Sequence, residues 1–138
     1  MSYRIAIVDG KGGGLGRAIC ERLSPMEGVT LLALGTNSHA TANMLKNGAK
    51  DGATGENAIC HMVDQVDLVI GPMAILVANA MMGEITPRMA QSIASCEAKK
   101  LLLPLQKCGI EVIGIKNMTM KDMLDKLVDE VDRIMNKQ

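Results

Sequence analysis

The chain has 138 residues, 15 basic and 15 acidic side chains, and a single aromatic residue, Tyr3. This length predicts one domain over residues 1–138 and is too short for separate cofactor and substrate lobes. The balanced charge and the lack of rings exclude a typical nucleic-acid surface, which needs basic residues on one face and rings for stacking, so we expect no nucleic-acid partner.

Short β-rich runs alternate with helical patterns in the first half of the chain. The runs are apolar without polar alternation, which is typical of strands covered on both faces of a parallel sheet. The predicted strands cover residues 4–8, 29–34 and 66–70. The predicted helices cover residues 15–23, 40–47 and 56–64, and residues 51–55 are predicted to form a loop.

The second half of the chain predicts three further helices and two further strands. An almost wholly apolar helix is expected over residues 73–82, and Thr86-Pro87 opens another because proline favours the first helical position. Strands are predicted over residues 101–103 and 111–115. Thr119 is the predicted cap of the last helix, whose apolar residues keep strict helical spacing.

This alternation of strands and helices predicts the fold class. Strands joined through helices form right-handed crossovers, so we expect an α/β protein with a three-layer Rossmann-like fold and a five-stranded parallel sheet. Ligands of such folds bind beyond the carboxyl ends of the strands. The segments that follow the predicted strands are therefore the candidate site.

The segment after the first strand, residues 9–16, reads Asp-Gly-Lys-Gly-Gly-Gly-Leu-Gly. Its glycines leave backbone N–H groups free to point at an anion, and the helix that follows adds the positive end of its dipole. The alternative is a tight turn, for which one or two glycines would suffice. The residues expected to bind phosphate are Gly10, Lys11, Gly12, Gly13, Gly14, Leu15 and Gly16.

The spacing of Gly10, Gly14 and Gly16 resembles the glycine motif of the short-chain dehydrogenases. Those enzymes use a catalytic tyrosine followed four residues later by a lysine, and Tyr3, the only tyrosine here, has no such lysine. The resemblance therefore does not extend to their chemistry. No Lys-Ser or Lys-Thr pair follows the loop either, which argues against nucleotide hydrolysis.

Thr36 and Asn37 follow the second predicted strand, where an NAD site carries an acid for the ribose hydroxyls. Neutral hydroxyl and amide groups suit a phosphate better, but no arginine lies nearby in sequence for the extra phosphate of NADP. We therefore expect NAD(P) or another phosphate-bearing nucleotide as the small phosphorylated ligand. Gly71 and Pro72, after the third predicted strand, complete the expected binding residues.

Two carboxylates are candidates for catalysis, Asp9 and Glu56. Asp9 either binds magnesium or acts as a general base, or it caps the N–H groups of its own glycine loop, which is the interpretation that we favour. Glu56 stands near a helix start, where an acid is usually a partner of the helix dipole. His39 and His61 are isolated, so no metal site is predicted.

Membrane association and disulfide bonding are not predicted. The most apolar stretch, residues 68–83, is interrupted by Gly71-Pro72 and is too short to cross a bilayer. The cysteines do not have the close spacing of zinc or redox pairs, so we expect reduced thiols and a cytoplasmic location. They are Cys20, Cys60, Cys96 and Cys108.

The whole chain resembles a family of small bacterial proteins catalogued as a domain of unknown function. The resemblance implies no activity, but it gives weight to Thr36, Asn37, Glu56 and Asn57. It is carried by residues 9–16, 34–37 with 40–41, 52–59, 71–72, and 83–87 with 89–90.

Three functions remain open at this point. The chain is a nucleotide-binding module, a small enzyme acting on a phosphorylated or carboxylate metabolite with Asp9 or Glu56 as acid/base, or an interaction subunit whose glycine loop is only structural. The helix predicted over residues 73–82 is apolar on nearly every side and must be covered all round. We therefore expect a homodimer, with burial under the helix that begins at Thr86 as the alternative.

Overall fold

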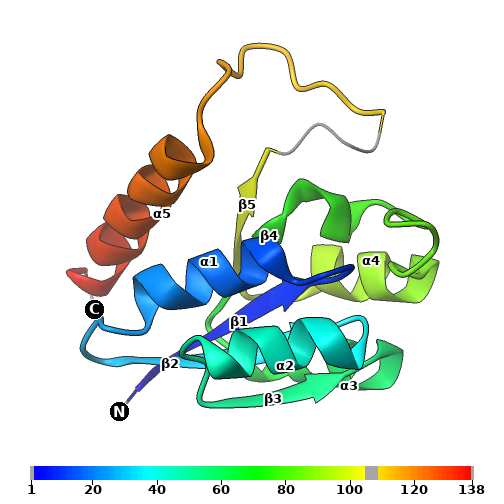
Figure 1. The fold of residues 1–138 in the computed structure, drawn as a ribbon, viewed down its shortest axis with the longest axis horizontal. Helices are drawn as coiled ribbons and strands as arrows, with labels where there is room; N and C mark the ends of the chain where they lie inside the picture. Colours follow the sequence, from blue (N-terminus) through cyan, green and yellow to red (C-terminus); the bar gives the residue numbers. More distant parts are fainter. Residues whose placement is uncertain (1, 105–108, 138) are drawn as a thin grey trace.

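The computed structural model describes residues 2–104 and 109–137 and has an α/β fold built on one parallel sheet (Figure 1). The five strands lie in the order β3-β2-β1-β4-β5, which is consistent with the predicted Rossmann-like fold. The strands are β1 (Tyr3–Asp9), β2 (Val29–Gly35), β3 (Asp51–Thr54), β4 (Leu68–Pro72) and β5 (Lys99–Leu103).

Helices cover both faces of this sheet (Figure 1). The helices α1, α2 and α5 pack on one face, and α3 and α4 pack on the other. The α-helices are α1 (Gly14–Leu23), α2 (Ser38–Lys46), α3 (Glu56–Met62), α4 (Pro87–Ser95) and α5 (Met120–Met135). Two 3₁₀ turns flank β4 along the chain: η1 (Val63–Gln65) precedes it and η2 (Met73–Leu76) follows it.

The core explains why the central strands lack polar alternation. Successive side chains of a strand point to opposite faces of the sheet. In β1, Ile5 and Ile7 enter the core under α1 and α2, whereas Ala6 and Val8 enter the core under α3 and α4. All four are fully buried, so both faces of β1 select for apolar residues. The prediction of a parallel sheet between two helical layers is confirmed.

The predicted strand set is wrong at two places. Residues 51–54, predicted as part of a loop, form β3 and pair in parallel with β2. Residues 111–115, predicted as a strand, belong to no strand and are exposed. A parallel neighbour of β5 needs a crossover of about a dozen residues or more, and residues 104–110 are too few to supply one. The fifth strand is therefore β3, at the opposite edge of the sheet.

The predicted helix over residues 73–82 is also wrong. Only η2 is helical, and residues 78–84 form turns in which the backbone is left-handed at Asn79, Met81, Met82 and Gly83, with φ of 66°, 57°, 56° and 91°. Such a φ is costly for residues other than glycine. This left-handed turn, residues 79–83, folds back toward the glycine loop, and its tertiary contacts outweigh the helical preference of its sequence.

The last helix is confirmed as predicted. The Thr119 hydroxyl accepts a hydrogen bond from the Asp122 amide at 3.1 Å, which caps α5. Arg22 of α1 pairs with Asp125 of α5 at 2.6 Å and ties the two helices together. Residues 109–119, which precede α5, form an arch that stands out from the sheet (Figure 1).

Candidate functional site

The carboxyl ends of β1 and β4 are neighbours in the sheet, and the chain leaves them toward opposite faces. This is the topological switch point, where ligands of doubly wound sheets bind. A cavity of about 490 Å³ opens there, within the usual range of small-molecule sites. It is lined by residues 9–15 of the glycine loop, by Pro72 and Ala74, and by residues 80–82 of the left-handed turn.

The glycine loop presents backbone amides to this cavity. The Gly13 amide donates to the Gly10 carbonyl at 2.9 Å, and α1 then begins at Gly14 without a side-chain cap. The amides of Gly12, Gly14 and Leu15 have no hydrogen-bond partner in the part of the chain that the structure describes. Unsatisfied amides at a helix N-terminus form a site for an anion.

Packing separates the glycines of the loop into two kinds. A Cβ at Gly10 would lie 2.5 Å from the Thr36 Oγ1, one at Gly13 would lie 2.8 Å from the Ala40 Cα, and one at Gly16 would lie 2.6 Å from the Met44 Sδ. Gly13 is required by the fold because it has a φ of 73° and a backbone neighbour, and Gly10 and Gly16 are closely packed by the side chains around them. A Cβ at Gly12 or Gly14 would meet nothing within 4 Å, and neither residue has a positive φ. Neither packing nor backbone conformation explains the glycine at these two positions.

Asp9 holds the two ends of the loop together. Its Oδ1 accepts from the Gly10 amide at 2.8 Å and its Oδ2 accepts from the Gly16 amide at 2.7 Å. Asp9 is 4% exposed. Burial raises the pKa of its carboxyl, whereas the hydrogen bonds from the two backbone amides lower it. The interpretation of Asp9 as the cap of its own loop is confirmed. A carboxylate whose two oxygens are both engaged in this way is a positioning group.

Thr36 and Asn37 support the glycine loop from the β2 side and do not line the cavity. The Thr36 amide donates to the Asp9 carbonyl at 3.0 Å. The Asn37 Nδ2 donates to the Lys11 carbonyl at 2.9 Å, while its Oδ1 accepts from the Ala40 amide and caps α2. The two residues that were predicted to bind a ligand after β2 therefore contact β1 and the glycine loop, and neither faces the cavity.

Glu84 is a residue of this site that the sequence analysis missed. Its Oε1 accepts from the Lys11 amide at 2.8 Å, from the Thr36 hydroxyl at 2.6 Å and from the Asn37 Nδ2 at 3.0 Å. These donors hold the pKa of the Glu84 carboxyl below its usual value. Glu84 lies far from all three in sequence, so the only available signal was its place in the segment that carries the family resemblance.

The other predicted residues are divided between the cavity and its surroundings. Glu56 lies at the start of α3, where Thr86, the N-cap of α4, and Arg88 of α4 lower the pKa of its carboxyl, and it does not line the cavity. Pro72 lines the cavity. Gly71 is buried, and a Cβ there would lie 2.5 Å from the Val8 carbonyl oxygen, so it permits the close packing of β4 against β1.

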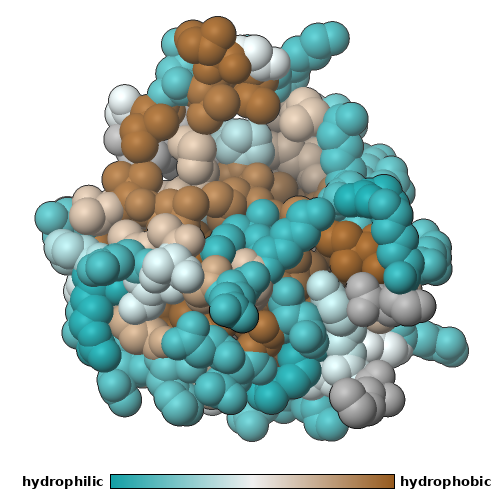
Figure 2. All heavy atoms as spheres, turned by 180° about the vertical axis from the view of Figure 1, so that it is seen from behind, coloured by the Kyte–Doolittle hydropathy of each residue, from teal (hydrophilic) through white to brown (hydrophobic). Residues whose placement is uncertain are grey.

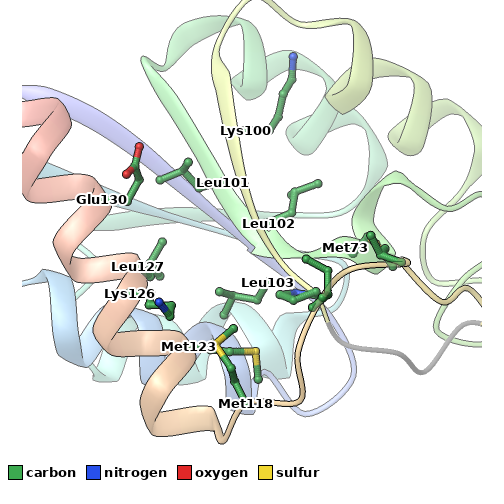
Figure 3. A pocket seen from close by; sticks show the side chains of 13 residues that line it. Met73, Lys100, Leu101, Leu102, Leu103, Met118, Met123, Lys126, Leu127 and Glu130 are labelled. Atoms are coloured by element: carbon green, nitrogen blue, oxygen red, sulfur yellow. The ribbon is translucent and has the colours of Figure 1, made fainter.

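A second hollow, of about 460 Å³, lies between β5 and α5. Figure 3 shows Leu103, Met118, Met123 and Leu127 gathered in it, whereas Lys100 points away. The lining is almost entirely apolar, and the polar groups around it do not converge on one point. A specific small-molecule site combines apolar walls with convergent polar groups, so the hollow at the glycine loop is the stronger candidate.

Two further findings concern residues 2–104 and 109–137 as a whole. None of their helices has the length and apolar character needed to cross a membrane. Nor do they contain a group of three or more His, Cys, Asp or Glu side chains placed to hold a metal ion. Cys20, Cys60 and Cys96 are buried free thiols, and Cys108 lies outside the described residues.

Comparison with known proteins assigns the chain to a family without assigning an activity. Residues 4–136 match the family described as a domain of unknown function, DUF3842. No curated protein matches the sequence.

Proposed function

The chain belongs to the DUF3842 family, and we propose that it binds a phosphate-bearing nucleotide or dinucleotide, NAD(P) or similar, at the glycine loop. The observation that carries this proposal is the open space at Gly12 and Gly14. Both glycines line the cavity, and no contact within residues 2–104 and 109–137 requires the absence of a side chain there. A ligand that approaches the backbone closely does require it.

The phosphate is expected over the N-terminus of α1. The amides of Gly12, Gly14 and Leu15 supply donors, and the helix dipole favours negative charge at this end. The Lys11 side chain, exposed beside them, adds a positive charge. An apolar wall formed by Pro72, Ala74 and residues 80–82 faces the loop and suits a ring or another apolar group of the ligand.

A catalytic role for the two candidate carboxylates has less support. Asp9 uses both oxygens to hold the loop, and Glu56 pairs with Arg88 at 3.4 Å outside the cavity. The geometry therefore favours a binding module over an enzyme that uses either residue as acid/base. An interaction subunit with a purely structural loop is the outcome that the experiment below must exclude.

Thermal unfolding of the purified protein with NAD, NADP, ATP, flavin, coenzyme A and sugar phosphates tests the proposal. A ligand at about one hundred times its Kd stabilises the fold by about 2.7 kcal/mol. Each kcal/mol moves the Tm of a domain of this size by roughly 3 to 5 °C, so a shift near ten degrees is expected.

Two matched variants complete this experiment. Gly14→Val should abolish the shift while the protein stays folded, because its side chain enters open space. Ala94→Val, at an exposed position of α4 outside the cavity, should keep the shift. No shift with any phosphate compound, together with a folded Gly14→Val protein, would leave the loop as a structural element.

We also propose that the protein works in the cytoplasm as a homodimer. Residues 109–119, which form the arch before α5, expose apolar side chains, with Ile113 88% exposed, and β5 is an edge strand of the sheet in the described part of the chain. Figure 2 shows hydrophobic residues on this arch and in the band beneath it. Such surfaces favour self-association. Sedimentation at micromolar protein tests this, and a monomer alone would contradict it.

A further inference from the structure

The end of β2 lacks an acidic residue of its own, but an acidic side chain reaches it from elsewhere in the chain. In dinucleotide-binding folds, an acid near the end of the second strand accepts hydrogen bonds from the ribose hydroxyls. Here β2 is followed by Thr36 and Asn37, and the Glu84 carboxylate lies against both. The same carboxylate oxygen accepts from the Lys11 amide, so Glu84 joins the end of β2 to the glycine loop.

One oxygen of this carboxylate remains available. Oε1 accepts all three hydrogen bonds, whereas Oε2 has no partner among the residues that the structure describes. The Glu84 side chain is only partly buried, so the site is open to solvent. A carboxylate fixed through one oxygen offers the other as an acceptor in a defined position, and it repels a second anion placed there.

The backbone that precedes Glu84 is strained. The left-handed turn directly precedes it, and three of its four left-handed residues are not glycine. The turn is closed by backbone hydrogen bonds from the Asn79 amide to the Ile85 carbonyl at 2.7 Å and from the Gly83 amide to the Asn79 carbonyl at 3.0 Å. Strained backbone of this kind is concentrated at functional sites, where the surrounding structure holds it.

The glycine loop contacts both the cavity and Glu84. The cavity lined by Pro72 and the left-handed turn lies on the β4 side of the loop, and Glu84 lies with Thr36 on its β2 side. A ligand with phosphates over the loop would therefore place one group in the cavity and a second group toward Glu84. A mononucleotide would use only one side, whereas two groups joined through phosphates would use both.

We propose, on the basis of the nucleotide binding proposed above, that Glu84 reads the ribose of a dinucleotide-type ligand. The unphosphorylated ribose hydroxyls donate to the Glu84 Oε2, the phosphates lie over Gly12 and Gly14, and a second ring enters the cavity between β1 and β4. Glu84 then selects NAD-type ligands and rejects those with a phosphate on the ribose. Glu84 would thus supply the acid at the end of β2, although it belongs to the turn that follows η2.

Titration calorimetry with NAD and NADP tests this inference on the wild-type protein and on Glu84→Gln. Glutamine keeps an oxygen for the three donors and replaces Oε2 with a group that no longer carries charge. We expect the wild-type protein to bind NAD about tenfold or more tightly than NADP, since a hydrogen bond to a charged group is lost and a repulsion is added. The variant should bind the two with similar Kd.

Glu97→Gln, at an exposed position on another surface, is the control and should keep the wild-type preference. Thermal melts establish that each variant is folded. Equal affinity of the wild-type protein for NAD and NADP, or an unchanged preference in Glu84→Gln, would overturn the role of Glu84 while leaving nucleotide binding intact. Absence of binding by NAD, NADP and every other phosphate compound would overturn both proposals.

Discussion

Replacing Gly16 with alanine separates the glycines that the fold requires from those that it leaves open. An added Cβ at Gly16 would lie 2.6 Å from the Met44 Sδ and 3.0 Å from both the Met44 Cγ and the Asp9 Cβ. Met44 is fully buried between the helices and the sheet, and Asp9 is held by two backbone amides. Both neighbours are buried, so we expect the methyl group to overpack the core.

The magnitude follows from two opposing effects. Overpacking of this kind costs about 1 to 3 kcal/mol. Alanine in place of glycine in a helix returns at most about 1 kcal/mol. Because the methyl group would crowd both Met44 and Asp9, the overpacking cost should lie in the upper half of its range. The net loss in the free energy of unfolding is then roughly 1 to 2 kcal/mol, which lowers the Tm by roughly 3 to 10 °C for a domain of this size.

Thermal melts by circular dichroism measure this loss, with Gly14→Ala as the matched control. Gly14 lies two residues earlier on the same helix, and a Cβ there meets no atom within 4 Å. The control should keep or slightly raise the Tm of the free protein. An unchanged Tm in Gly16→Ala, or an equal fall in both variants, would refute the division of the loop into structural and open glycines.

Two other predictions address the left-handed turn and the buried thiols. Met82 has a φ of 56° and is 92% exposed, so Met82→Gly should relieve strain at little packing cost and raise the stability by roughly 0.5 to 1 kcal/mol in urea unfolding; a loss would contradict the strain. Burial, with Asp9 and Glu21 adding to it, raises the pKa of Cys20 to about 12, so mass spectrometry should find it unlabelled by iodoacetamide in native protein at pH 8 and labelled in urea. Rapid native labelling would contradict this.

The sequence by itself determined the features that depend on neighbouring residues. The apolar runs of β1, β2 and β4 predicted buried parallel strands because both faces of each strand enter a core. The glycines after β1 predicted a loop that opens a helix, and Thr119 with the spacing of apolar residues predicted α5. The hydrogen bonds of Asp9 to the amides of its own loop could also be predicted, because Asp9, Gly10 and Gly16 are close in sequence.

Only the tertiary structure decided where weak or ambiguous segments lie. β3 has the sequence Asp-Gly-Ala-Thr, whose strand propensity is low, and it is a strand because β2 offers it a register. Residues 111–115 have the opposite character: they favour a strand but follow β5 too closely to pair with it in parallel. In both places the available partner outweighed the local preference.

The same principle decided the candidate site. Residues 73–82 read as an apolar helix, but contacts with the glycine loop turned the chain after η2 and placed Glu84 beside Thr36, 48 residues away in sequence. The hydrogen bonds of a carboxylate depend on which donors the fold brings within about 3 Å of it, and local sequence does not encode that distance. Tertiary packing therefore supplied the acid that the end of β2 lacks.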